Sequence, residues 1–294
     1  MTHAHPRAHP TRRLVVVIAL TATFLLVEAA GGVISGSLAL LSDAGHMLTD
    51  LLALVLSLMA ARFAMLPPNP AKTYGYRRLE ILTALVNGTI LVLVAGLLLW
   101  RAAVRFVAPV PVAAPMMIGV ALLGLFANLA GLWLLSGDGG LNIRGARMHL
   151  WGDALSSFGV VAGSIAIALT GWYRIDPVVA GVVSVVIAFG AMRLVREAVD
   201  VLLEAAPAGL AIGDVERAIC AVPGVVEVHD LHVWSITTGM PALSGHVGVD
   251  AGAAAAPDAV LARIAAALRE RFGITHSTLQ IETADHGARC DVAH

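Results

Sequence analysis

Six long apolar stretches constrain the fold of this chain more than any other feature of its sequence. A bilayer core about 30 Å thick needs roughly 20 mainly apolar residues in helical conformation, and each stretch meets this need. The stretches run approximately over residues 14–37, 43–65, 79–104, 115–136, 146–170 and 176–195. Charged residues make up only 13% of the 294 residues, about half of their share in soluble domains. We therefore predict a multi-pass α-helical membrane protein with six transmembrane helices.

The first stretch could be mistaken for a secretory signal, because a basic segment precedes the apolar run that starts at Leu14. This run continues to about Leu41, which is too long for a signal core, and no clean cleavage pattern interrupts it. We therefore expect a retained first helix behind a short N-terminal tail, residues 1–13. The compact loops and the lack of a visible organellar targeting signal favour the plasma (inner) membrane of a bacterium.

The loops between the stretches differ in their basic residues. With the N-terminus placed inside, eleven Lys and Arg residues fall at the inner ends, and three fall outside, at Arg101, Arg105 and Arg174. Short cytoplasmic loops carry an excess of Lys and Arg. We therefore expect the N- and C-termini to be cytoplasmic.

The chain changes character after about Glu204, so we divide it into a tail (1–13), a transmembrane transport domain (14–204) and a cytoplasmic domain (205–294). In the last domain, alternating apolar residues predict strands and amphipathic stretches predict helices. The expected order is helix 212–222, strand 225–236, strand 242–250, helix 257–272 and strand 276–282. This α+β order suits a small sheet covered on one face by two helices.

A short motif, His-x-x-x-Asp, occurs in two of the apolar stretches. The second stretch contains His46 and Asp50, and the fifth contains His149 and Asp153. Residues four apart lie on one face of a helix. Ionisable residues inside a membrane span are disfavoured and usually mark an ion path. Two facing helices with this motif would supply two imidazoles and two carboxylates, a four-coordinate set that zinc accepts.

These donors also indicate the chemistry of transport. Imidazole with carboxylate suits Zn²⁺, cobalt or iron better than magnesium or calcium, and no thiolate lies in the spans to favour copper(I). The donors leave the choice among zinc, cobalt and cadmium open. Histidine titrates near neutral pH, and a bound metal displaces protons from its ligands. A site open alternately to each side could therefore exchange metal for protons.

Other polar residues in the spans have more than one interpretation. Glu28 could line the path or pair with an arginine, and Asp43 could cap its helix or lie at the cavity entrance. Asn87 and Asn128 are expected to hydrogen-bond between helices. We interpret Cys220, in the first helix of the cytoplasmic domain, as a core residue.

Several classes of function compete with a proton-coupled exporter. A passive metal channel could use the same ligands, although tight tetrahedral sites release ions slowly. A metal sensor would not need six spans. An intramembrane metalloenzyme would need an open metal position and a general base, for example His-Glu-x-x-His, which is absent. We therefore expect no enzyme and no organic cofactor. The net charge of −1 gives no basic surface for nucleic acid.

Four segments together resemble the cation diffusion facilitator family: LLSDAGHMLTD, YGYRRLEILTALVNG, LNIRGARMHLWGDALSS and IDPVVAGVVSVVI. Two more, REAVDVLLEAAP and HDLHVWSI, are similar to the zinc and cobalt-zinc-cadmium exporters of that family. The resemblance implies a metal/proton antiporter that forms a homodimer in the lipid membrane, with a ferredoxin-like cytoplasmic domain. It also implies a transport site at His46, Asp50, His149 and Asp153.

The resemblance further implies a regulatory metal site between cytoplasmic domains. The matching positions are His229, His246 and Glu282, and His232, His276 and Gln280 lie close to them in the motifs. Zinc bound there would stabilise a closed dimer by mass action. Surface histidines without a metal are the alternative, and Cys290 is a lesser candidate ligand.

The chain departs from some members of the family in its loops. The segment PPNPAKTY between the second and third spans has no His, Asp or Glu, so we predict no metal site there. The segment SGDGGLNIRG between the fourth and fifth has no histidine. His3, His5 and His9 could collect metal, or could be incidental residues of a disordered tail.

Overall fold

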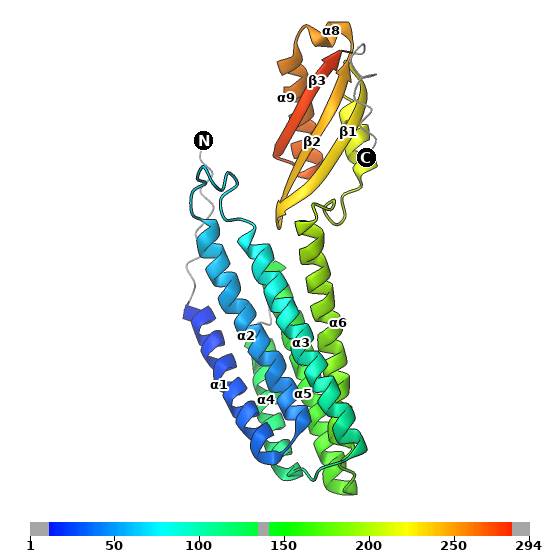
Figure 1. Ribbon diagram of the computed structural model, residues 1–294. Helices are drawn as coiled ribbons and strands as arrows, with labels where there is room; N and C mark the ends of the chain where they lie inside the picture. Colours follow the sequence, from blue (N-terminus) through cyan, green and yellow to red (C-terminus); the bar gives the residue numbers. More distant parts are fainter. Residues whose placement is uncertain (1–11, 135–140, 284–294) are drawn as a thin grey trace. The chain divides into compact units, whose positions relative to one another are not determined.

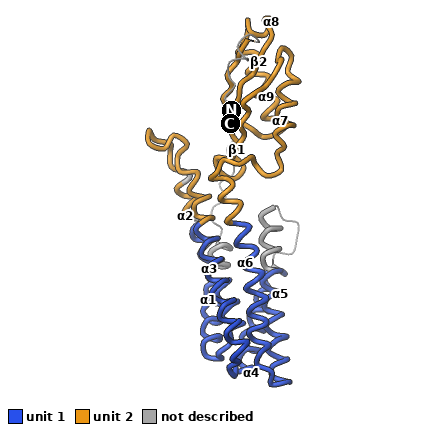
Figure 2. The backbone as a smooth tube through the Cα atoms, turned by 45° about the vertical axis from the view of Figure 1, so that its right-hand side comes forward, with its two compact units in different colours: residues 1–56, 86–194 blue, residues 57–85, 195–294 orange. Residues whose placement is uncertain are grey.

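The computed structural model divides into two compact units (Figure 2). It describes residues 12–134 and 141–283. The units comprise residues 1–56 with 86–194, and residues 57–85 with 195–294. Long helices form the first unit, and the second contains the β-sheet together with the ends of three of those helices.

The long helices occur where the apolar stretches predict them (Figure 1). Their bounds are α1 Arg12–Ser35, α2 Leu38–Ala64, α3 Leu79–Val107, α4 Ala114–Leu134, α5 Leu141–Thr170 and α6 Ile175–Leu202. Among the described residues, four helical segments are long and apolar enough to cross a membrane: Leu79–Val107, Ala114–Trp133, Trp151–Thr170 and Ile175–Leu202. A shorter apolar segment, Ala22–Ser35, belongs to α1.

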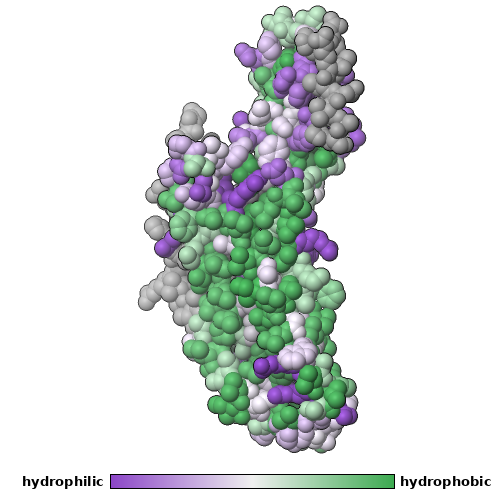
Figure 3. Space-filling model, viewed as in Figure 1, coloured by the Kyte–Doolittle hydropathy of each residue, from purple (hydrophilic) through white to green (hydrophobic). Residues whose placement is uncertain are grey.

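Large apolar side chains cover the outside of the helical unit on the face drawn in Figure 3. Phe126, Trp133 and Phe189 are 73%, 75% and 73% exposed, as are many aliphatic residues of the same helices to lesser degrees. In water such a surface would be unfavourable, because apolar area is driven out of contact with water. Helices that face lipid tails instead need apolar side chains on their outer surface, so this surface fits a bilayer.

Small residues bring α5 and α6 close together. A Cβ atom added at Gly163 would lie 2.9 Å from Cγ2 of Val179, which is closer than side chains pack. Val160 and Ala180, from the same two helices, are both fully buried in one apolar cluster. This agrees with the close helix packing that small residues permit in membranes.

The second unit contains a three-stranded sheet in the order β1-β2-β3. Its elements are α7 Ile212–Cys220, β1 Val225–Thr237, β2 Met240–Val249, α8 Ala251–Ala254, α9 Pro257–Phe272 and β3 His276–Thr283. The hairpin strands β1 and β2 are antiparallel. Strand β3 runs parallel to β2, because a helical crossover through α9 joins them.

One face of this sheet forms the core of the small domain. Leu243 and Val247 alternate along β2 and are buried, and they pack with Ile219 of α7 and Ile264 of α9. Both helices therefore cover the same face, and polar residues occupy the other. Gly273, with φ of 68°, ends α9 in the left-handed conformation that favours glycine. The predicted order of elements is confirmed, and the four-residue helix α8 is an addition to it.

Two interpretations of single residues are wrong. Asp43 does not cap α2, because the helix begins five residues earlier, at Leu38. Cys220 is exposed, whereas Val215, Ala218 and Ile219 supply the buried face of α7. The next residue along a helix points about 100° away from its neighbour, which turns the thiol out of the core.

Candidate metal sites

The two His-x-x-x-Asp motifs lie on α2 and α5, and the structure brings one residue of each together. His46 Nε2 lies 3.5 Å from Asp153 Oδ1, and both side chains are partly buried. Asp50 follows His46 by four residues in α2, and His149 precedes Asp153 by four residues in α5. The side chains of Asp50 and His149 lie outside the described part of the structure. The helices therefore bring at least one imidazole and one carboxylate within reach of a single ion.

A buried polar cluster from α2, α4 and α5 accompanies this pair. Asp43, 5% exposed, accepts hydrogen bonds from Ser156 Oγ at 2.7 Å and Ser157 Oγ at 3.5 Å. Asn128 Nδ2 donates to Ser157 Oγ at 3.4 Å, in line with the expectation of interhelical hydrogen bonding. Asp43 thus joins α2 to α5 three residues before His46.

Glu28 extends the polar cluster to α1. It is 2% exposed, and its Oε2 atom has no hydrogen-bond partner among the described side chains. A Cβ atom at Gly124 of α4 would lie 2.5 Å from its Oε1, so a larger residue there would require this carboxyl to move. Of the two interpretations of Glu28, pairing with an arginine has no support among the described side chains. Burial of a carboxylic acid within a membrane span is energetically unfavourable, and acids that are retained in spans are typically residues on an ion path.

A second cluster of metal-binding side chains lies on the sheet face opposite the helices. His229 of β1 pairs with His246 of β2, and Glu282 lies on β3. One ligand atom from each residue lies within 4.8 Å of the others. His246 Nδ1 is 2.7 Å from Glu282 Oε1, and His229 Nε2 is 3.5 Å from Glu282 Oε2.

The distances in this second cluster are close to those that a zinc ion requires. Ligand atoms at about 2.1 Å from one ion lie no more than roughly 4 Å apart. Small side-chain rotations would therefore be enough for all three ligands to converge. His229 Nε2 and Glu282 Oε2 are buried and have no hydrogen-bond partner within residues 12–134 and 141–283. Buried polar atoms are normally satisfied, so this facing pair suits a cation between them.

A bulge in β1 adds a fourth polar side chain beside the cluster. The strand register shifts between His229 and His232, and Asp230 there has a left-handed φ of 49°. Its Oδ2 lies 3.8 Å from His246 Nε2, and its Oδ1 lies 2.9 Å from His232 Nε2. Bulges of this kind often re-aim side chains near functional sites. Asp230 belongs to the segment HDLHVWSI, but no spacing pattern within that segment marks it as a neighbour of His246.

A small hollow lies next to His246 at the edge of the cluster. Its volume is about 140 Å³, and it is lined by Asp230, Ser244, Gly245, His246, Thr278 and Gln280. Gln280 Nε2 donates to Glu282 Oε1 at 2.9 Å, which orients that carboxylate. His276 does not belong to this group of three ligands. Its Nε2 instead lies 3.3 Å from the Tyr74 hydroxyl. His3, His5, His9 and Cys290 lie outside the described residues.

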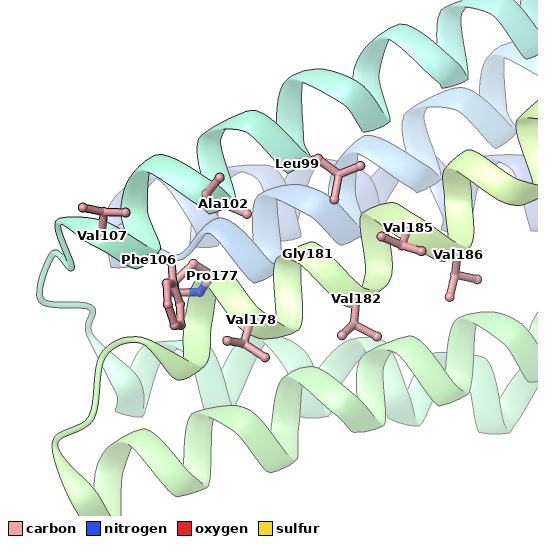
Figure 4. Close-up of a pocket in the computed structure, with 11 residues that line it drawn as sticks. Leu99, Ala102, Phe106, Val107, Pro177, Val178, Gly181, Val182, Val185 and Val186 are labelled. Carbon is pink, nitrogen blue, oxygen red and sulfur yellow. The ribbon is translucent and has the colours of Figure 1, made fainter.

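A groove of about 640 Å³ between α3 and α6 is unsuited to a metal ion (Figure 4). The side chains that line it are apolar, among them Leu99, Phe106, Val182 and Val186. No imidazole, carboxylate or thiol is among its lining residues. Its chemistry matches lipid tails and not the cation ligands of the other two sites.

Comparison with known proteins identifies both parts of the chain. Residues 14–203 match the cation efflux transmembrane domain, and residues 207–284 match the cytoplasmic domain of cation efflux proteins, ZT_dimer. The zinc transporter ZitB of Escherichia coli is 40% identical over 99% of this chain and 96% of its own length.

Two further relatives and one solved structure are similar to the chain. The metal cation efflux system protein CzcD of Cupriavidus metallidurans is 40% identical over 96% of this chain and 90% of its own. A cadmium, cobalt and zinc/H⁺-K⁺ antiporter of Bacillus subtilis is 36% identical over 97% and 93%. The solved metal-bound C-terminal domain of a CzcD transporter is 40% identical, covers 25% of this chain and 99% of that one, and has a TM-score of 0.23.

Proposed function

The chain belongs to the cation efflux family, the cation diffusion facilitators, and on this basis we propose that it exports Zn²⁺ from the cytoplasm in exchange for protons. It is an integral membrane transporter with a cytoplasmic C-terminal domain, and not an enzyme. The observation that carries the proposal is the His46–Asp153 pair, which joins the two motif helices at 3.5 Å.

The transport site in this proposal consists of His46, Asp50, His149 and Asp153. Each helix contributes an imidazole and a carboxylate one turn apart, so the two side chains of each pair lie on one face of their helix. Two nitrogen and two oxygen donors complete a tetrahedral shell for zinc and leave no open position for chemistry. The names of the relatives, which include zinc, cadmium and cobalt, support this choice of substrate class.

Proton exchange follows from the same four side chains. A metal ion binds deprotonated imidazole and carboxylate, so each ion that enters the site releases protons. When the site opens to the outside, protons at higher concentration displace the metal from the same ligands. One set of ligands that holds either metal or protons couples the two fluxes, and a relative named as an antiporter supports this coupling.

The cytoplasmic domain in this proposal holds a regulatory zinc at His229, His246 and Glu282. Its family name indicates dimerisation, and we propose a homodimer in which zinc favours one arrangement of the paired domains. The buried and unpartnered atoms of His229 and Glu282 support a cation at this position. An ion that binds one state more tightly shifts the population toward it.

The membrane and the orientation in this proposal are those expected from the sequence. We place the chain in the plasma (inner) membrane of a bacterium, with the N-terminus as well as the C-terminal domain in the cytoplasm. The excess of basic residues at the inner ends supports this orientation. The transport domain then extends over residues 14–204 and the cytoplasmic domain over residues 205–294.

Zinc flux in proteoliposomes with an imposed pH gradient tests the function. Native protein should accumulate zinc against its gradient, and Asp153→Asn should abolish this accumulation. Asp258→Asn, the same chemical change in an exposed turn of α9, should leave the flux unchanged. Native flux that ignores the pH gradient would favour a channel, and tight zinc binding without flux would favour a sensor.

A further inference from the structure

A carboxylate from α6 holds the N-terminal end of α2. Asp176, in the first turn of α6, accepts a hydrogen bond from Ser37 Oγ at 2.6 Å through Oδ1. Its Oδ2 accepts from the Leu38 backbone N–H at 2.8 Å, and its Oδ1 also accepts from the Ala39 N–H at 3.1 Å. The first N–H groups of a helix lack partners within the helix, and here a residue about 138 positions away supplies them.

Arginine from a third helix completes this arrangement. Arg105 of α3 donates from NH1 to Asp176 Oδ2 at 3.4 Å and also to the carbonyl of Gly36, which precedes α2. Asp176 is 1% exposed, so its charge is shielded almost entirely from water. We call Asp176, Arg105 and Ser37 the outer clamp, because α6 continues from its other end into the cytoplasmic domain.

The donors around Asp176 leave it no capacity for a ligand. A carboxylate has about four lone-pair positions, two on each oxygen. Ser37 and the Ala39 N–H occupy Oδ1, while the Leu38 N–H and Arg105 occupy Oδ2. Asp176 is therefore unsuited to carry metal, in contrast to Glu28, whose Oε2 has no hydrogen-bond partner in the part of the chain that the structure describes. Its four bonds all serve to hold helices together.

The clamp lies close to the transport site along α2. His46 follows Leu38 by eight residues, a distance of about 12 Å along a helix with a rise of 1.5 Å per residue. A stiff helix held at its first turn cannot slide or rotate without moving His46 as well. A side chain misplaced by 1 Å can already slow a reaction by orders of magnitude.

Breaking the clamp would be costly. It would leave a buried carboxylate without its partners, and uncompensated buried charges are strongly disfavoured. We propose that Asp176 is a positioning residue for transport, which holds the outer ends of α2, α3 and α6 together throughout the cycle. The inference rests on the proposed export function. Alternating access then has to occur by movement elsewhere in the bundle, around these three joined ends.

A covalent substitute for the clamp provides the test. The double variant Ser37→Cys, Asp176→Cys removes the carboxylate, and oxidation would join α2 to α6 through a disulfide at the same position. Both native cysteines, Cys220 and Cys290, would first be changed to Ser. Proton-driven zinc flux in proteoliposomes gives the rates, and free-thiol counting with a maleimide-polymer reagent measures the disulfide.

The clamp predicts loss and recovery of transport. The reduced double variant and Asp176→Asn should lose at least about tenfold in maximal rate, because α2 is no longer held in place. The oxidised double variant should recover to within about threefold of the native rate, because a bond restores position without charge. The single variants Ser37→Cys and Asp176→Cys, treated with the same oxidant, should show no recovery.

Several outcomes would overturn the inference. An oxidised variant that stays inactive would mean that the clamp opens during the cycle or that the carboxylate itself carries an ion. Asp176→Asn with native flux would contradict its importance. Native protein without zinc flux would instead refute the proposed function on which the inference rests. A native-like elution profile and melting temperature of each variant would ensure that lost flux is not lost folding.

Discussion

At the scale of the residue, donor chemistry separates the proposed sites from the rest of the molecule. His46 and Asp153 combine a nitrogen and an oxygen donor in a partly buried position between two helices. His229, His246 and Glu282 repeat this combination on the sheet face opposite the helices. Such mixed sets suit zinc, whereas all-oxygen sets suit harder ions.

Metal selectivity should change with the two histidines of the proposed transport site. His46→Asp combined with His149→Asp would convert the set to four carboxylates, which favours manganese over zinc. We expect zinc to lose its advantage over manganese by at least about tenfold, since even outer-shell changes alter metal affinity 10–100-fold. Competition of the two ions for uptake into proteoliposomes measures this ratio. His276→Asp serves as control, and an unchanged ratio in the double variant would contradict the site assignment.

The exposed thiol of Cys220 should respond to a neighbouring charge. Although Cys220 is exposed overall, partial burial raises the pKa of its thiol above the ordinary value. The nearby Glu216 carboxylate raises this pKa further. Only the thiolate reacts, so Glu216→Gln should lower the pKa and speed alkylation by roughly twofold at neutral pH. Maleimide labelling from pH 7 to 9 in a Cys290→Ser background measures this, and Asp214→Asn should show no such acceleration.

At the scale of the element, small residues and bulges decide how helices and strands meet. Gly163 lets α5 approach α6 more closely than a side chain would allow. The bulge in β1 turns Asp230 toward His246, which a regular strand would not do. Both features act through backbone geometry.

Two glycines of α5 provide a matched pair for testing the close helix contact. Gly163→Ala should lower the stability by about 1–3 kcal/mol, because the added methyl group would overpack against Val179. Gly159→Ala has open space around its Cβ and should be neutral or slightly stabilising, since alanine favours helices by about 1 kcal/mol over glycine. Thermal unfolding in detergent gives both values. Equal effects of the two changes would exclude a close α5–α6 contact at Gly163.

At the scale of the whole molecule, the cytoplasmic domain belongs to a family named for dimerisation. Metal bound to this domain can therefore influence how two subunits pair. An ion that binds only the paired arrangement stabilises it by about 2.7 kcal/mol when present at 100 times its dissociation constant. The hollow beside His246 leaves this proposed regulatory ligand accessible to cytoplasmic metal.

Zinc removal should therefore loosen the pairing of cytoplasmic domains in the full-length protein. With donor and acceptor dyes on Cys220 in a Cys290→Ser background, zinc should raise energy transfer between subunits, and a chelator should reverse it. His246→Ala with Glu282→Ala should abolish this response, while His276→Ala should retain it. A zinc response that survives loss of both ligands would place the regulatory ion elsewhere.

The sequence alone was enough to predict the apolar helices, the order of elements in the small domain and the pairs at four-residue spacing. These features are local, since composition and periodicity within one segment determine them. Only the tertiary structure decided where α2 begins, because its first N–H groups are satisfied by Asp176 from α6. Strand register likewise brought His229 beside His246, and helix rotation turned Cys220 outward. Such contacts join residues far apart in the chain, and no local pattern encodes their geometry.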